Sequence, residues 1–374
     1  MQYLYDSIIR SAENYLTLQQ KDGSFLPGHN GPWNDPETPV RNTAHIAMLL
    51  HKAYRISGEK KYRDAAVKAC DFLLMKKNRP QGYNFHCRKK SMKADPVNGT
   101  IGPAWAVEPL IFIGKDLKKK EYLDLAEEIV SMHRFSNKRK LWHIKNLDGT
   151  DGIIDETFNH QLWFGAMALT IARLRKNKRL LDEASSFFSN LPNIVTFIEP
   201  GLIEHTFRRD GMGYRMKRVL ISLIERAKGN QDFTQRRSRG YLAFNTYGFA
   251  IAYDNNKSLS MWKDKRLKAL IRKPLEYLRK NYPMDLRSGK SSYSWAFNPT
   301  GIEAAYSLQA LAGYSGLKIK KKELDKEIAK WVSDQINHYF STRTGFMERN
   351  TTDSRVLSAR LYEAVRLENI KVDA

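Results

Sequence analysis

The strongest constraint on the fold of this chain is an internal repeat of apolar helical segments. Six times along the 374 residues, a small or polar cluster opens a strongly apolar stretch long enough for a helix. Consecutive segments start about 60, 55, 85, 56 and 56 residues apart, which predicts one repeated supersecondary unit with a single long insertion. The six segments are 42–54, 102–114, 157–174, 242–253, 298–314 and 354–367.

A second set of predicted helices lies between these segments. Their apolar residues recur at i, i+3, i+4 and i+7 with charged residues between them, which is typical of surface helices with one buried face. The first set is apolar nearly all round and is therefore expected to be buried. The amphipathic segments are 5–19, 60–77, 120–135, 177–191, 264–280 and 321–340.

Six buried helices that alternate with six amphipathic ones predict an all-α fold of the (α/α)6-toroid type, with an inner ring inside an outer ring. An open helical-repeat solenoid is the alternative, but solenoid helices expose one face each. We expect a single domain over residues 1–374. Long loops precede the inner helices, so the inner-helix N-termini are expected to form the working face. Residues 192–239 are predicted to be an arginine-rich loop insertion on that face.

The charge balance bears on the expected partners. Lys and Arg number 63 against 40 Asp and Glu, a formal net charge of +23, which favours an anionic partner but says nothing about fold. No apolar run approaches the length of a membrane span, so none is expected. Basic runs such as 236–241 lack a known nucleic-acid module, and we do not expect nucleic-acid binding.

The cysteine and histidine content gives two further expectations. Cys70 and Cys87 form neither a disulfide framework nor a metal quartet, and no HExxH or Cys–His spacing occurs. We therefore expect no metal and no cofactor. Two cysteines are also compatible with a reducing compartment, and a cytoplasmic location is the simplest expectation. The oligomeric state does not follow from the sequence.

Residues 149–169, GTDGIIDETFNHQLWFGAMAL, carry the most informative pattern. This stretch resembles the unsaturated glucuronyl and rhamnogalacturonyl hydrolases, in which an Asp opens an inner helix of an (α/α)6 toroid. The fragment 53–66 also resembles a helix-turn-helix phrase of that group. The resemblance implies that Asp155 is a general acid and base. The group's partner Asp on the second inner helix is absent, because NGTIGPAWAVEPL stands there, with Asn98 and Glu108 as the polar candidates.

The predicted site combines these acids with aromatic and polar residues of the working face. Hydrolysis of a glycosidic bond needs two groups of different protonation, and Asp155 with Glu108 or Asp151 could supply them, Glu108 being the preferred partner. Aromatic faces stack on sugar rings, while amides, imidazoles and arginines hold hydroxyls and carboxylates. The predicted substrate-binding residues are Trp33, Asn42, His45, Trp105, Asn159, His160, Tyr247, Tyr293, Arg208 and Arg209.

These residues predict a glycoside hydrolase that acts on an acidic, uronate-containing oligosaccharide or polysaccharide. Two alternatives stay open. His and Tyr could instead remove the C5 proton of a uronate, as a lyase or an epimerase does. Alternatively, the chain could be a non-catalytic helical scaffold for an anionic partner, with Asp155 merely a helix cap. Carboxyl groups facing one pocket favour hydrolysis, whereas a pocket centred on His and Tyr favours proton transfer at carbon.

Overall fold

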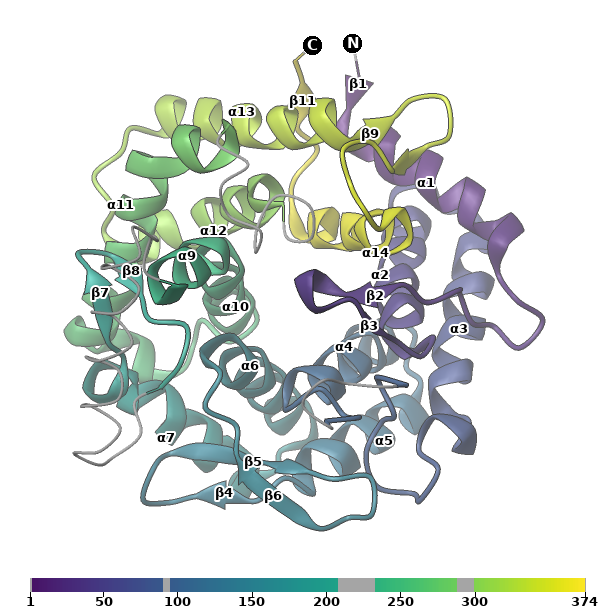
Figure 1. Ribbon diagram of the computed structural model, residues 1–374, viewed down its shortest axis with the longest axis horizontal. Coiled ribbons are helices and arrows are strands. Elements are labelled where there is room, and N and C mark those ends of the chain that lie inside the picture. Colours follow the sequence, from purple (N-terminus) through teal and green to yellow (C-terminus); the bar gives the residue numbers. More distant parts are fainter. Residues whose placement is uncertain (1, 90–94, 208–232, 288–298, 374) are drawn as a thin grey trace.

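The computed structural model describes residues 2–89, 95–207, 233–287 and 299–373. Its helices alternate between an inner and an outer ring around one axis (Figure 1), so the predicted (α/α)6 toroid is confirmed. Each inner helix packs on the next, and the last packs on the first. The inner ring consists of α2 (Val40–Ser57), α4 (Ile101–Asp116), α6 (Phe158–Arg175), α10 (Leu242–Asp254), α12 (Thr300–Ser315) and α14 (Ser354–Ala359), which the 3₁₀ helix η4 (Arg360–Arg366) continues.

The outer ring consists of the amphipathic helices. Each buries the apolar stripe that its 3.6-residue period creates and leaves its charged face in solvent. Several inner helices end in a left-handed residue, such as Gly58 after α2 and Gly316 after α12, which stops the helix and turns the chain toward the outer ring. The outer helices are α1 (Leu4–Leu18), α3 (Lys60–Leu74), α5 (Lys120–Ser131), α7 (Lys178–Ile194), α11 (Lys265–Arg287) and α13 (Lys321–Tyr339).

Strands in the described residues are short and belong to the loops. The pair β1 (Gln2–Tyr3) and β11 (Lys371–Val372) joins the two ends of the chain and closes the ring. One three-stranded sheet leads into inner helix α6 and consists of β4 (Phe135–Ser136), β5 (Leu141–Lys145) and β6 (Asp151–Ile154). The remaining strands are β2 (His29–Asn30), β3 (Asp35–Pro36), β7 (Phe197–Glu199), β8 (Leu202–Ile203), β9 (Phe340–Ser341) and β10 (Phe346–Met347).

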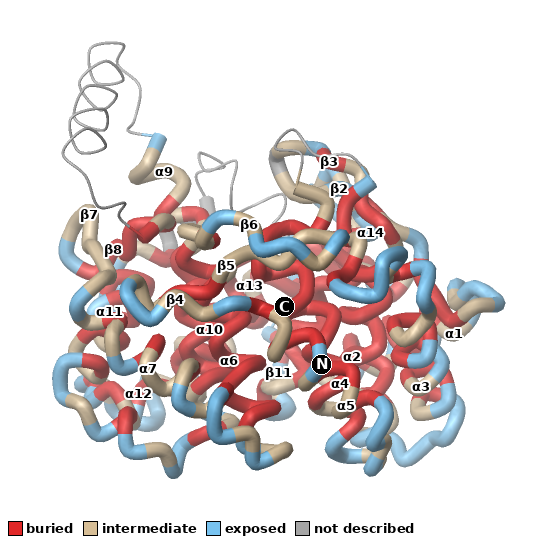
Figure 2. Tube along the Cα trace, turned by 90° about the horizontal axis from the view of Figure 1, so that it is seen from below, coloured by how far each residue is buried: buried red, intermediate tan, exposed pale blue. Residues whose placement is uncertain are grey.

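The loops that precede the inner helices gather on one side of the ring. Figure 2 shows β2, β3 and β6 on that side, together with helix α9 (Phe233–Gly240). Within the predicted insertion 192–239, β7, β8 and α9 are described, and they enter the same side. The short 3₁₀ helices are η1 (Gly31–Trp33), η2 (Lys76–Asn78) and η3 (Ser260–Lys263). Among the described residues, no helix combines the length and the apolar character that crossing a bilayer requires.

Candidate functional site

A cavity of about 650 Å³ opens at the inner-helix N-termini. Its wall combines two indoles, two imidazoles, arginines and three carboxylic acids, which is a polar and aromatic mixture suited to a sugar. Every loop named above on this side contributes to it. Residues that line the cavity include Asn30, Trp33, Arg41, Arg88, Asp95, Asn98, Gly99, Trp105, Asp155, Glu156, Asn159, His160, His205, Arg237, Tyr241, Phe244 and Arg360.

The central feature of the cavity is a hydrogen bond between His160 and Asp155. The Nδ1 atom of His160 lies 2.8 Å from Oδ2 of Asp155, and the two residues flank the start of α6. Asp155 is only 5% exposed, and its remaining contacts also come from the protein. Oδ2 accepts from the backbone N–H of Thr100 at 2.8 Å, and Oδ1 accepts from that of Thr157 at 3.0 Å. All the contacts of this carboxylate therefore hold it as an anion.

Electrostatics support this description of Asp155. Burial alone would raise the pKa of its carboxyl group, but the nearby His160 and the two backbone N–H donors outweigh burial and lower the pKa to about 2. The Thr100 and Thr157 amides are at the N-termini of α4 and α6, where the helix dipoles also favour a negative charge. An acid with such a low pKa is a poor proton donor at neutral pH and a good partner for an imidazole.

The surrounding backbone fixes the position of this pair. The side chain of Gln161 donates to the carbonyl oxygens of Asp155 and Trp142, both at 2.7 Å, and so ties β5 to the start of α6. Gly99 adopts a φ of +59°, and a Cβ atom there would lie 2.3 Å from Oδ2 of Asp155 and 2.6 Å from Nδ1 of His160. The close approach of this loop to the pair therefore requires glycine.

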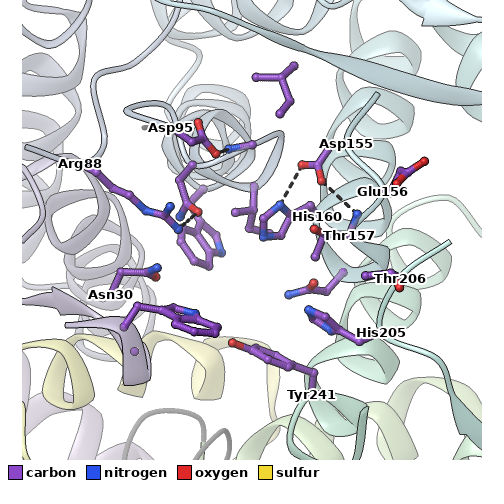
Figure 3. Close-up of a pocket in the computed structure, with 18 of the residues that line it drawn as sticks. Asn30, Arg88, Asp95, Asp155, Glu156, Thr157, His160, His205, Thr206 and Tyr241 are labelled. Atoms are coloured by element: carbon purple, nitrogen blue, oxygen red, sulfur yellow. Dashed lines mark hydrogen bonds and ion pairs between the residues drawn. The ribbon is translucent and has the colours of Figure 1, made fainter. Parts of the chain in front are cut away.

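Another histidine enters the cavity near His160. His205 is 4% exposed, and its ring stacks on Tyr241 with ring centroids 4.3 Å apart. Its carbonyl oxygen accepts from the backbone N–H of Phe158, which anchors it beside α6. In Figure 3, His160, His205 and Tyr241 point into the cavity from one side, while Asn30 and Arg88 enter from the other. The cavity is thus bordered by histidine and tyrosine on one side and by cationic and amide groups on the other.

The structure brings five of the twelve predicted site residues to this cavity. One of the two predicted catalytic acids is among them, and the other four come from the predicted substrate-binding set. Their assignment to catalysis or substrate binding stays a prediction. The five are Trp33, Trp105, Asp155, Asn159 and His160.

Glu108 does not reach the cavity, and this corrects its predicted pairing with Asp155. It is 1% exposed inside the ring, where Oε1 accepts from Arg366 at 2.5 Å and Oε2 from the indole of Trp163 at 3.1 Å. A buried glutamate on an inner helix can serve a site or balance a buried arginine, and the sequence does not distinguish the two. Here the arginine arrives from η4, far away in the sequence.

We predict that Glu108→Gln lowers stability and leaves catalysis intact. The substitution keeps the shape of the side chain but leaves Arg366 as a buried charge without its counter-ion, which costs about 3–5 kcal/mol of unfolding free energy. Denaturant unfolding and turnover per folded molecule would be measured on the same preparations. If turnover is lost while stability is unchanged, Glu108 has a catalytic role after all.

Three more predicted residues lie outside the cavity lining. Asn42 donates to the carbonyl oxygen of Leu26 at 2.9 Å and lines a separate, smaller groove. His45 is buried beneath Trp105 and stacks on Tyr362, with ring centroids 3.9 Å apart. Tyr247 is fully buried and donates to the carbonyl oxygen of Glu363 at 3.0 Å. His45 and Tyr247 are thus packed as core residues, and Asn42 holds the loop at Leu26 against α2. Arg208, Arg209 and Tyr293 lie outside the described residues.

Arg41, Arg360 and His205 also line the cavity, but none of them is among the residues predicted from the sequence. Arg360 lies within the inner segment 354–367, and a charge within a segment predicted to be buried is a signal that could have found it. Arg41 lies just before the segment 42–54, where this signal does not apply. His205 lies in the insertion outside any periodic pattern, and no local signal marks it.

Comparison with known proteins gives one close relative along the whole chain. No family model matches. Archaeal glycosylation protein Q of Haloferax volcanii is 32% identical over 384 residues, an alignment that covers 100% of this chain and 99% of the relative.

Solved structures share the fold at low identity. Cellobiose 2-epimerase from Bacillus thermoamylovorans matches with a TM-score of 0.68 at 13% identity over 96% of this chain and 98% of that one. An α-1,6-mannanase from Salegentibacter matches with a TM-score of 0.61 at 12% identity, over 97% of this chain and 98% of that one. An unsaturated glucuronyl hydrolase specific for heparin matches with a TM-score of 0.61 at 12% identity, over 97% of this chain and 94% of that one. The chain therefore has the toroid fold of carbohydrate-active enzymes, and its full-length identity to the Haloferax protein places it in the family of archaeal glycosylation protein Q.

Proposed function

We propose that this protein is a carbohydrate-active enzyme that transfers a proton at a sugar carbon next to the carbonyl group of an opened aldose or next to the carboxyl group of a uronate. The outcome would be sugar epimerisation or β-elimination. The observation that carries the proposal is the hydrogen bond between His160 and the buried carboxylate of Asp155, within a cavity that also holds His205 and Tyr241. A family relative named for glycosylation and sugar-epimerase neighbours in fold are consistent with it.

His160 is suited to be the base. Because Asp155 accepts at Nδ1, that nitrogen carries the proton in the neutral ring, and the lone pair is left on Nε2. His160 lines the cavity, so this lone pair is available to a bound sugar. When Nε2 takes the proton, the ring becomes cationic, and the Asp155 carboxylate stabilises that cation as it forms.

The step balances without a further reactant. The C–H bond breaks, the proton goes to Nε2 of His160, and the electron pair forms a C=C bond while the neighbouring C=O group becomes an enolate oxygen. Return of a proton to the opposite face, from His205 or Tyr241, inverts the carbon. Alternatively, the enolate electron pair forms a C=C bond to the next carbon, the C–O bond there breaks, and the leaving oxygen takes a proton from His205 or Tyr241, which gives an unsaturated sugar. Trp33 and Trp105 would stack on the sugar, and Asn159 would bind a hydroxyl group.

Hydrolysis of an acidic oligosaccharide is the second candidate. It is favoured by Asp95, Asp155 and Glu156, three carboxylic acids that line the same cavity. Against it, both oxygens of Asp155 accept hydrogen bonds from the protein, and its pKa of about 2 removes the proton that a general acid must donate. If the reaction is hydrolysis, Asp95 or Glu156 would have to be the general acid.

Isotope exchange separates the two reactions. The wild-type protein would be incubated in D2O with neutral aldoses, glucuronides and uronate oligosaccharides, and products would be read by NMR and by reducing-end assay. We expect deuterium at the sugar carbon next to the carbonyl or carboxyl group. New reducing ends without deuterium would replace the proposal by hydrolysis. Neither signal with any sugar would favour the non-catalytic scaffold.

A further inference from the structure

The inner helices end on the side of the ring opposite the cavity, because the cavity opens at their N-termini. Figure 2 shows that side at the bottom, opposite β2, β3, β6 and α9. A hollow of about 800 Å³ lies there, and the ends of α2, α4 and η4 and the turn after α10 supply Arg55, Lys115, Arg366 and Asn255 to its lining. We define the back face as the turns that follow α2, α4, α6, α10 and α12, which are residues 55–61, 115–121, 173–179, 254–268 and 315–323.

Cationic side chains are concentrated on the back face. Its five turns hold 21 of the chain's 63 Lys and Arg residues but only 6 of its 40 Asp and Glu residues. One set of back-face lysines is exposed and forms no ion pair with any acid among the described residues. This set consists of Lys60, Lys115, Lys118, Lys176, Lys178, Lys263, Lys265, Lys318, Lys320 and Lys322. The back face therefore carries positive charge that the described part of the protein does not neutralise.

The outer helices show that this charge is not there for helix stability. Five of the six outer helices named above begin on the back face with a lysine, whereas α1 begins with Leu4 and has Asp6 in its first turn. The N-terminus is the positive end of a helix dipole and favours acids, so a lysine there works against the helix. In α3, α7 and α11 no acid of the first turn offsets it. The five lysines are Lys60, Lys120, Lys178, Lys265 and Lys321.

The arrangement of the back-face turns favours a flat partner. The turns follow five different inner helices, and Figure 1 shows these helices spread around the ring axis. A planar anionic surface can meet all five turns at once, whereas a rod of nucleic acid meets only the turns along its path. None of the large apolar side chains that are exposed among the described residues belongs to these turns. The contact is therefore electrostatic and does not involve insertion of apolar side chains.

We propose that the back face docks this protein on an anionic lipid bilayer, with the cavity facing away from the membrane. Lysines that lie close to a bilayer are attracted by its acidic headgroups, and several such charges act together. Docking of this kind needs no spanning helix. It also leaves the cavity open to a sugar, because the cavity and the back face lie at opposite ends of the inner helices. It is independent of the reaction that the cavity performs.

The test measures binding of the full-length protein to lipid vesicles by co-sedimentation. One set of vesicles contains phosphatidylcholine alone, and the other also contains about 30% phosphatidylglycerol, so that the two differ in surface charge. At about 0.1 M salt, we expect the partition coefficient to be at least about tenfold higher for the anionic vesicles. It should fall at least about tenfold at about 0.5 M salt, because ions screen the surface potential. Equal binding to both sets, or no binding to either, would overturn the proposal.

Charge reversal locates the contact on the protein. A back-face triple variant, with Lys118→Glu, Lys119→Glu and Lys120→Glu, should lower the partition coefficient at least about tenfold. The matched control makes the same change of charge in the loops that precede α2 and α4, on the cavity side, with Lys21→Glu, Lys76→Glu and Lys77→Glu. Its partition coefficient should stay within about threefold of the wild-type value. Equal losses in the two triple variants would mean that net charge alone attracts the protein, which contradicts a back-face contact.

Acetylation of lysines in the wild-type protein decides the orientation even if a variant fails to fold. Anionic vesicles should protect Lys118 and Lys320 from the reagent and leave Lys76 reactive. Protection of Lys76 in their place would put the membrane on the cavity side and overturn the proposal. Duplex DNA serves as the competing probe. Binding of DNA that the back-face triple variant abolishes, without binding to vesicles, would identify a nucleic acid as the partner and contradict membrane docking.

Discussion

Replacing His160 by Gln is expected to lower turnover by about 10²–10⁴-fold, because a carboxamide cannot accept a proton from carbon. The side chain can still donate a hydrogen bond to Asp155, so the start of α6 should keep its structure. Deuterium exchange and substrate turnover would be measured together. Both should fall by the same factor if His160 is the base.

His51→Gln is the control for this substitution. His51 also pairs with an aspartate, since its Nε2 atom lies 3.0 Å from Oδ2 of Asp116, but the pair lies toward the C-terminal ends of α2 and α4. Its replacement should leave turnover near the wild-type value. In His160→Ala, added imidazole should restore part of the exchange. Near-normal exchange in either His160 variant without added imidazole would show that another group removes the proton.

Asp155→Asn is expected to cost about 10²-fold or more in turnover. The amide cannot serve as an anionic acceptor, so His160 loses the partner that fixes its tautomer and stabilises its cation. The same variant should also be less stable, because the backbone N–H groups of Thr100 and Thr157 would face a neutral side chain. KM for a sugar should change much less than kcat, since the proposed role of Asp155 acts through its hydrogen bond to His160.

The stability effect has a defined pH dependence. The pKa of Asp155 is about 2 in the folded protein against an ordinary value of 3.8. A carboxyl group whose pKa is lower in the folded state stabilises the protein at every pH above its unfolded-state pKa, here by about 2 kcal/mol. This stabilisation is lost as the pH falls from about 4 through about 2. Acid unfolding of Asp155→Asn should lack this contribution.

Acid titrations of both proteins, followed by circular dichroism, would measure that difference. Parallel acid-unfolding curves would contradict the assigned pKa. A variant that loses stability but keeps normal turnover per folded molecule would show that Asp155 is a structural cap, as the sequence alone had allowed.

The helical repeat could be predicted because it follows from the local periodicity of apolar residues along the chain. An inner helix that is apolar all round, such as the segment 102–114, must be covered on every side, whereas an outer helix needs one stripe. The predicted starts at 42, 102 and 157 agree with helices that begin at Val40, Ile101 and Phe158. The working face followed from the same pattern, because loop length and composition are local properties.

Partnerships between side chains could not be predicted in this way. Asp155 was found because it opens an inner helix, but its low pKa depends on His160 and on the backbone N–H of Thr100, which lies 55 residues earlier. Glu108 looked equally suitable as a catalytic acid until ring closure brought Arg366 to it from 258 residues away.

The sequence by itself thus determined the ring, its working face and the presence of Asp155 and His160 at one helix start. Only the tertiary structure decided that His205 joins them and that Arg41 and Arg360 line the same cavity. The physical reason is that periodicity encodes which face of a helix is buried. The charges and hydrogen bonds that meet inside the ring depend on contacts between repeats far apart in the chain.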